Sequence, residues 1–250
     1  MRSTIIAAAC VLLGGFTACN STESQESRVD TSAVGSVKEH EAPTGFNFSE
    51  AHPIDSTDYV IYPLSATTNA EEEDEYGGLY KSSDRSSTYL NIVFYNMVSK
   101  KYRLLDNRRM LIKSYSIGDD AEEYKAKSSH GALPRLIYYK VIVNDYNGDG
   151  KLGWPDPEYL FISDLAGSYF KQISPDNLNV DGWKQVPEKG KVLIQITEDT
   201  NRDKKFEYEG NSIPYVYDIK LGVVATPIFR KGFTDTVSSL LKKQWAKKEN

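Results

Sequence analysis

Cysteine is almost missing from this 250-residue chain, whose only two cysteines are Cys10 and Cys19. A domain built from the later residues therefore has no thiol and no disulfide bond, so noncovalent packing alone must stabilise it. Histidine is nearly as rare, with three residues in all, and none of them shows the spacing of zinc ligands. The sequence thus excludes a disulfide-rich fold and argues against thiol and zinc chemistry.

Motifs of the common catalytic mechanisms are missing as well. There is no Gly-x-Ser-x-Gly segment, and the glycines Gly148 and Gly150 stand among aspartates that would repel a phosphate group. The net charge of −5 gives no electrostatic basis for nucleic acid binding. Nothing selects a glycosidase pair from the 35 acidic residues. We therefore expect a protein that is not an enzyme and does not bind nucleic acid, with a carbohydrate-active enzyme or sugar-binding module as the alternative.

The first apolar run, residues 5–16, follows Arg2 and is too short to span a bilayer stably. It has the form of the hydrophobic region of a secretory signal. The segment Phe16-Thr17-Ala18-Cys19 that ends it resembles a bacterial lipobox, in which the cysteine becomes the acylated first residue of the mature chain. This resemblance implies a signal peptide at residues 1–18 and a membrane anchor at Cys19, the alternative being plain cleavage and secretion.

The residue after this cysteine is Asn20, not the aspartate that retains some Gram-negative lipoproteins at the inner membrane. The resemblance therefore implies an outer membrane lipoprotein of the bacterial cell envelope, facing either the periplasm or the cell surface. Residues 20–45 are poor in large apolar side chains and rich in Ser, Thr and Glu. Such a segment cannot bury enough surface to fold alone. We expect residues 19–45 to be a lipidated, flexible tether and residues 46–250 to be a β-rich domain.

Short runs of β-branched and aromatic residues dominate the rest of the chain, which contains 17 tyrosines. They predict strands at residues 59–62 (ending at Pro63), 90–96, 102–105, 110–115, 136–143, 157–162, 193–197, 213–217 and 219–229, of which 90–96 and 102–105 form a hairpin. Near the end, Val237, Leu240, Leu241 and Trp245 recur at helical spacing. We expect a helix at residues 234–247 that packs on the sheet, with a membrane-binding helix as the alternative.

The loop at residues 145–156 has the residue pattern of a calcium loop. Asp145, Asn147, Asp149, Lys151 and Asp156 occupy positions 1, 3, 5, 7 and 12, and a glycine occupies position 6. At position 7 only the backbone carbonyl is needed, so a lysine is acceptable there. Both flanking segments are strand-like, whereas an EF-hand has helices on both sides. The sequence therefore predicts an EF-hand-like site for Ca²⁺ in a β setting.

A weaker copy of this loop follows 54 residues later, at Asp199, Asn201 and Asp203. Here Lys204 replaces the glycine of position 6, and position 12 lacks a carboxylate, so Glu207 or Glu209 would have to substitute. Two interpretations stay open: a second calcium site, or a turn in which Asp and Asn side chains bond the local backbone.

The segment at residues 165–175, which ends in Gln172-Ile173-Ser174-Pro175, resembles the blade pattern of the TolB-like and related β-propeller families. The resemblance covers roughly residues 136–230 and implies an antiparallel sheet built blade by blade. The expected fold is all-β, with propeller-like antiparallel blades that are complete or incomplete and a C-terminal helix. A β-sandwich with propeller-like hairpins is the alternative.

Together these features predict a calcium-binding envelope lipoprotein without enzymatic activity that acts as a binding or scaffold module. The binding role is inferred by analogy between folds, because Tyr-rich and Trp-rich β surfaces commonly recognise other molecules. The expected partners are the membrane, through Cys19, and another envelope protein or a glycan.

Overall fold

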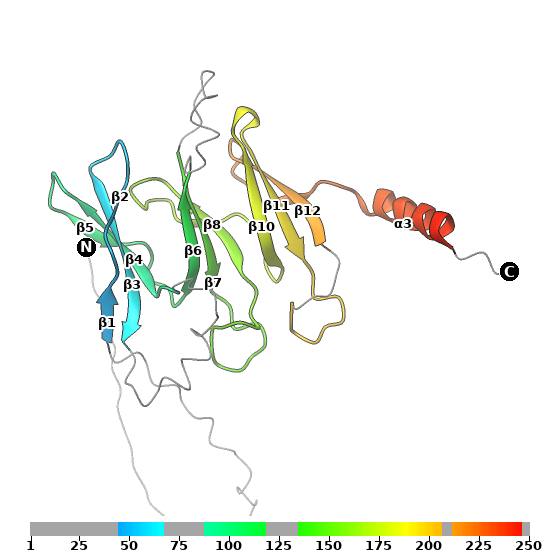
Figure 1. Ribbon diagram of the computed structural model, residues 1–250, viewed down its shortest axis with the longest axis horizontal. Coiled ribbons are helices and arrows are strands. Elements are labelled where there is room, and N and C mark those ends of the chain that lie inside the picture. The colour runs from blue at the N-terminus through cyan, green and yellow to red at the C-terminus, as the bar shows by residue number, and fades with distance from the viewer. Residues whose placement is uncertain (1–44, 68–87, 119–134, 207–211, 247–250) are drawn as a thin grey trace, which may run out of the picture. The chain divides into compact units, whose positions relative to one another are not determined.

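Strands form three antiparallel sheets in the computed structural model, which describes residues 45–67, 88–118, 135–206 and 212–246 (Figure 1). We name the sheets A, B and C in chain order. Sheet A contains β1 (Gly45–Phe48), β2 (His52–Pro53), β3 (Tyr59–Thr67), β4 (Asn91–Asn96) and β5 (Tyr102–Leu104). Sheet B contains β6 (Leu111–Ile117), β7 (Ile137–Ile142), β8 (Tyr159–Ser163) and β9 (Lys171–Gln172). Sheet C contains β10 (Asn179–Val186), β11 (Lys191–Thr197), β12 (Ser212–Asp218) and β13 (Thr226–Pro227).

Sheets B and C are meanders in which each strand pairs with the next one along the chain. Sheet A follows the order β1-β3-β4-β5, with β2 paired beside β1 on the same edge of β3. A short 3₁₀ turn, η1 (Pro187–Lys189), joins β10 to β11, and the helix α3 (Lys231–Trp245) follows sheet C. The all-β prediction with a C-terminal helix is therefore confirmed.

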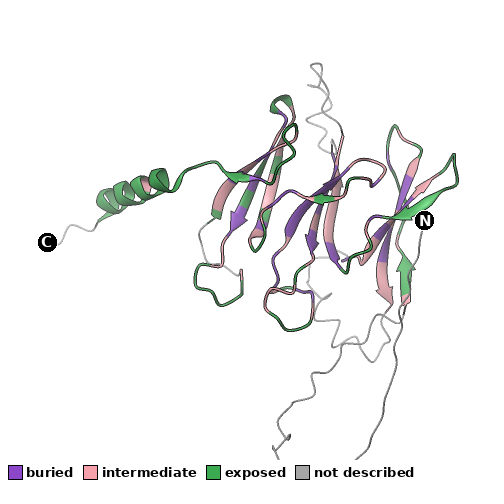
Figure 2. Cartoon of the chain, turned by 180° about the vertical axis from the view of Figure 1, so that it is seen from behind, coloured by how far each residue is buried: buried purple, intermediate pink, exposed green. Residues whose placement is uncertain are grey.

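Sheet B is the middle layer of the fold, because its two faces enter two different cores (Figure 2). Along β8 the side chains alternate: Tyr159 and Phe161 enter the core shared with sheet A, whereas Leu160 and Ile162 enter the core shared with sheet C. All of these side chains are at least 96% buried. Burial of this much apolar surface is the main force that holds the three layers together.

Sheets B and C repeat each other in structure as well as in sequence. In both, the first strand of a central hairpin leads into one of the two Asp/Asn loops, and the second strand leads into a turn closed by an aspartate, Asp164 or Asp218. One backbone hydrogen bond recurs at the same offset of 54 residues, from Ser174 N–H to Leu160 O and from Ile228 N–H to Pro214 O. The described sheets do not close into a propeller, so only the all-β part of that prediction is confirmed.

The strand expected to end at Pro63 continues through it to Thr67. Proline has no N–H to donate, but Pro63 lies where β3 passes from its pairing with β2 to its pairing with β1. No hydrogen bond from residue 63 is required on that edge of the strand. The missing donor therefore costs the sheet little, and the prediction of a strand end was wrong.

The helix predicted at residues 234–247 is present as α3, but it is not packed on a sheet. None of its residues is buried, and Leu240, Leu241 and Trp245 are exposed. Its amphipathic pattern is thus real, while the expected sheet contact is wrong.

The described helices include none that is long and apolar enough to cross a membrane. The predicted signal peptide (1–18), Cys19, nearly all of the tether (19–45) and Glu207 lie outside the described residues.

Candidate functional site

The predicted calcium loop joins β7 to β8 and is built by hydrogen bonds from backbone N–H groups to acidic side chains. The Asp145 carboxylate accepts from the N–H groups of Gly148, Asp149 and Gly150 at 2.7, 3.0 and 2.8 Å. The Asp149 carboxylate accepts from Lys151 N–H at 2.8 Å. Gly148 and Gly150 both have positive φ, of 78° and 83°, which glycine adopts without strain.

Asp156 closes this loop from its far end. Its carboxylate accepts from the N–H groups of Tyr146 and Gly153 at 2.8 and 2.9 Å, and from Asn147 N–H at 3.5 Å. The Asp156 residue is only 3% exposed. Burial raises the pKa of the Asp156 carboxyl above its ordinary value, because a buried negative charge is poorly solvated. A cation beside this carboxylate would offset that cost.

The second loop joins β11 to β12 and has the same internal pattern of hydrogen bonds. Asp199 accepts from the N–H groups of Arg202 and Lys204 at 2.7 and 3.0 Å, as Asp145 accepts from Gly148 and Gly150. Arg202 and Lys204 both have φ of +64°, at the positions where the first loop has glycines. Arg202 and Lys204 therefore each adopt a left-handed backbone conformation, at a cost of order 1 kcal/mol per residue.

The two loops contact each other at one end of the fold (Figure 1). The Tyr146 hydroxyl donates to Asp199 at 3.2 Å, and its ring centroid lies 5.3 Å from that of Phe206. Lys204 Nζ donates to the Asn147 carbonyl at 3.3 Å. Burial, followed by the negative charge of Asp199, raises the pKa of Tyr146. A change in one loop is therefore expected to reach the other through Tyr146.

Asp145, Asn147, Asp149 and Asp156 all lie on the loop between β7 and β8. Asn147 Nδ2 donates to Asp149 at 3.0 Å. Over the described ranges, however, no three His, Cys, Asp or Glu side chains are gathered closely enough to hold a metal ion. The donor set of carboxylate, amide and carbonyl oxygens is the chemistry that Ca²⁺ prefers. Of the second loop, Asp199, Asn201 and Asp203 are described and Glu207 is not.

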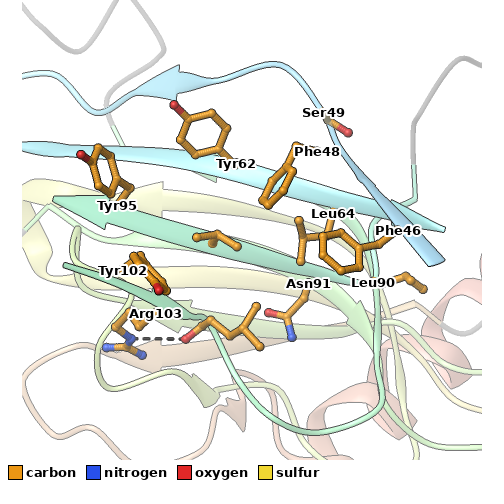
Figure 3. Close-up of a pocket in the computed structure, with 12 residues that line it drawn as sticks. Phe46, Phe48, Ser49, Tyr62, Leu64, Leu90, Asn91, Tyr95, Tyr102 and Arg103 are labelled. Atoms are coloured by element: carbon orange, nitrogen blue, oxygen red, sulfur yellow. Dashed lines mark hydrogen bonds between the residues drawn. The ribbon is translucent and has the colours of Figure 1, made fainter. Parts of the chain in front are cut away.

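A groove on the outer face of sheet A, which the sequence did not predict, is the second feature of interest (Figure 3). The registers of β1, β3, β4 and β5 place one apolar side chain beside the next across this face. Phe46, Phe48 and Leu64 gather at one end, and Tyr95 and Tyr102 lie at the other. The cavity volume is about 890 Å³. This volume falls in the range of ligand pockets.

Three aromatic side chains of this groove are exposed although the opposite face of the sheet is packed. Phe46, Phe48 and Tyr102 are 56%, 61% and 77% exposed. The ring centroids of Phe46 and Phe48 are 5.5 Å apart in an edge-to-face arrangement, and those of Phe48 and Tyr62 are 6.1 Å apart. Such contacts hold the rings in place and keep the apolar surface ordered.

The charged, amide and serine side chains that line the groove are engaged within the chain. Arg103 donates to Gly167 O at 2.7 Å and to the Ser168 hydroxyl at 2.8 Å. Asn91 donates to the Asp106 carbonyl at 2.7 Å, and the hydroxyl of Ser49 lies 2.9 Å from that of Ser65. The groove therefore offers mainly apolar contact to a partner.

A signal for this groove does exist in the sequence of β4. Ile92 and Phe94 enter the core, but Val93 and Tyr95, on the other face of the same strand, are apolar too. A strand that is apolar on both faces needs a cover on both. In sheet B both covers are present; in the described part of sheet A only one is.

Comparison with protein-family models, with curated proteins and with solved structures found no match to this chain.

Proposed function

We propose that this chain is a non-enzymatic binding protein of the bacterial envelope and that the groove on sheet A is its binding surface. The observation that carries the proposal is the exposure of Phe46, Phe48 and Tyr102 on a sheet whose other face is packed. Contiguous exposed apolar patches of this kind mark interaction sites, and buried aromatic anchors supply much of the binding energy. An apolar segment of another envelope protein fits a groove that is mainly apolar and whose Arg103, Asn91 and Ser49 side chains are already hydrogen-bonded.

A sugar-binding module is the second candidate, favoured by the tyrosines Tyr62, Tyr95 and Tyr102 along the groove. Tyrosine presents an apolar ring face together with a hydroxyl group, as sugar recognition requires. A glycoside hydrolase is supported less, because no Asp or Glu is among the described residues that line the groove. Hydrolysis by the usual mechanisms needs two carboxylates that face each other across the bond.

The test is photo-crosslinking in intact cells. With p-benzoylphenylalanine in place of Tyr102, we expect a discrete covalent adduct that contains a second protein. The same substitution of Leu221 serves as the matched control, because Leu221 is 70% exposed but does not line the groove. An adduct made of glycan would favour the second candidate. Equal crosslinking at both positions, or none at Tyr102, would rule out the groove as the binding surface.

We also propose that the first loop binds Ca²⁺ through Asp145, Asn147, Asp149, the carbonyl of Lys151 and Asp156. The support is the donor set and the buried, poorly solvated carboxylate of Asp156. Bound calcium would neutralise the repulsion between three carboxylates and fix the ends of β7 and β8. Its role is to stabilise the fold.

Calcium is therefore expected to raise the free energy of unfolding by about 2.7 kcal/mol when the free ion is at a hundred times its dissociation constant. Asp149→Ala should abolish this gain, because it removes a ligand. Asp203→Ala is the matched control: it removes an equally exposed aspartate at the equivalent position of the second loop, and most of the gain should remain. Denaturant unfolding with calcium and with a chelator measures both. Absence of calcium heat in calorimetry, with unchanged unfolding, would refute the site.

The proposed location is the outer membrane, through acylation of Cys19 after removal of residues 1–18. Incorporation of labelled palmitate should be lost in Cys19→Ala and kept in Cys10→Ala, since Cys10 would be removed with the signal peptide. Labelling that survives in Cys19→Ala would contradict the anchor.

The repeated hydrogen bonds of sheets B and C support an interpretation of the sheets as successive blades of an incomplete propeller. Propellers are built by repetition of antiparallel meanders. The groove does not depend on closure, because it lies on sheet A alone. A crystal structure in which sheets B and C failed to superpose strand by strand would contradict this interpretation.

A further inference from the structure

Helix α3 presents an apolar stripe that the described part of the chain does not cover. Phe233, Leu240, Leu241 and Trp245 are spaced so that they share one side of the helix, with Val237 between them. Leu240 is 52% exposed and Trp245 is 82% exposed. Figure 2 shows the helix exposed along most of its length. Phe229, just before the helix, extends the stripe, with its ring centroid 5.2 Å from that of Phe233.

The remaining faces of this helix are basic. Residues 230–246 contain Arg230, Lys231, Lys242 and Lys243 against one acidic residue, Asp235, which gives this segment a net charge of +3. The whole chain has a net charge of −5, so positive charge is concentrated here. Lys231 Nζ lies 3.4 Å from Asp235 Oδ1, and the other three basic side chains are exposed.

We propose that α3 lies on an anionic membrane surface, with its apolar stripe inserted between the lipid headgroups. A helix with an apolar face, lysines beside it and an aromatic residue at its end is suited to the interface between water and acyl chains. Basic side chains next to it are attracted by negatively charged headgroups. Because residues 230–246 have a net charge of +3, an anionic membrane surface is favoured over an electrically neutral apolar surface as the partner of α3.

The segment that connects α3 to sheet C is too short for the helix to bind in the groove of sheet A in the same molecule. Ala225 and Ile228 are held to sheets B and C by backbone hydrogen bonds, to Ile173 O and Pro214 O, so the helix begins only three residues beyond Ile228. The groove lies on the outer face of sheet A, on the far side of sheet B. Layers stack at about 10 Å. A segment of three residues reaches about 10 Å, which is too short to span them.

Vesicle co-sedimentation of residues 40–250 tests the proposal. This fragment is the compact unit that contains all three sheets, and it lacks Cys19, so no acyl chain contributes. We expect it to bind vesicles that contain phosphatidylglycerol at low salt, and to bind pure phosphatidylcholine vesicles at least about tenfold more weakly. Binding to the anionic vesicles should also weaken as salt rises, because salt screens the charges.

Two variants with the same change of charge distinguish insertion of the apolar stripe into the membrane from electrostatic attraction between the helix and the headgroups. Ser239→Glu places the new charge opposite the apolar stripe and should weaken binding about fivefold. Leu240→Glu places it within the stripe and should weaken binding at least about tenfold further, because the inserted leucine is lost as well. Both residues are exposed, so neither variant should change thermal unfolding.

Equal effects of the two variants would overturn the proposal, as would failure of the unaltered fragment to bind anionic vesicles. A third outcome would also overturn it: a fragment that is dimeric in light scattering, becomes monomeric with Leu240→Glu and does not sediment with vesicles. In that case α3 docks on a second copy of the chain.

Discussion

Replacing Gly167 with alanine is expected to lower the free energy of unfolding by about 3 kcal/mol, the larger share from overpacking and the rest from backbone strain. A Cβ atom at residue 167 would lie 2.5 Å from Cε2 and 2.6 Å from Cδ2 of Phe94. Phe94 is fully buried in the core between sheets A and B, so its ring cannot move aside. Gly167 also has a φ of +72°, which alanine adopts only with strain.

The turn that contains Gly167 is one of the places where sheets A and B are joined. Its backbone follows β8 and is closed by Asp164, whose carboxylate accepts from the N–H groups of Ala166 and Ser168. From sheet A, Arg103 donates to the Gly167 carbonyl. A shift of this turn away from Phe94 would therefore break bonds on both sides of the joint.

Gly182→Ala is the control for this experiment. A Cβ atom at residue 182 would have no neighbour within 4 Å, and the residue does not have a positive φ. We expect Gly182→Ala to change stability by less than about 1 kcal/mol. Chemical denaturation of both variants measures the difference. In the double variant Gly167→Ala with Phe94→Leu, the two losses should be less than additive, because the smaller side chain makes room. Equal losses for Gly167→Ala and Gly182→Ala would mean that the turn does not pack on Phe94.

The three-layer arrangement could be predicted in part from β7 and β8. Their apolar residues form continuous runs, such as Tyr159 to Ile162, which indicate strands that are buried on both faces. In β11, by contrast, Val192, Ile194 and Ile196 are buried while Leu193 and Gln195 between them are exposed, so one face meets solvent. Periodicity thus distinguishes the middle sheet from an outer one, without showing which sheets are neighbours.

Periodicity does not predict whether an apolar face is buried when the element that would pack against it lies far away in the chain. Val93 and Tyr95 in β4 have the same pattern as the residues of sheet B, yet their face lies open. Likewise the stripe of α3 predicts a helix and says nothing of what lies against it. Local sequence determines that a surface is apolar, whereas its partner depends on how the layers are stacked or on another molecule.

The two Asp/Asn loops were predictable from the sequence because their geometry depends on residues that are close together in the chain. Aspartate and asparagine at alternating positions bond the backbone two to five residues ahead, and both copies do so in the same way. The contact between the loops, through Tyr146 and Asp199, was not predicted. It follows from the packing of sheet B on sheet C, which brings the same ends of two repeats together.

Asp156→Ala is expected to lower the free energy of unfolding by about 3 kcal/mol even when a chelator removes every divalent ion. The substitution leaves the N–H groups of Tyr146 and Gly153 without their acceptor, and each buried donor that loses its partner costs about 1–3 kcal/mol. It also releases the far end of the loop. The loss of an unfavourable buried charge offsets part of this cost.

Asp149→Ala provides the comparison, since it removes the same charged group from the same loop. Asp149 is exposed and accepts one backbone hydrogen bond, from Lys151 N–H, so in chelator we expect a loss of less than about 1 kcal/mol. With calcium present, both variants should lose the additional stability that the ion gives to the unaltered chain. The chelator experiment therefore measures the hydrogen bonds of Asp156 less the cost of its buried charge, and the calcium experiment measures ligation. If the two variants were equally stable in chelator, Asp156 would not be the residue that closes the loop.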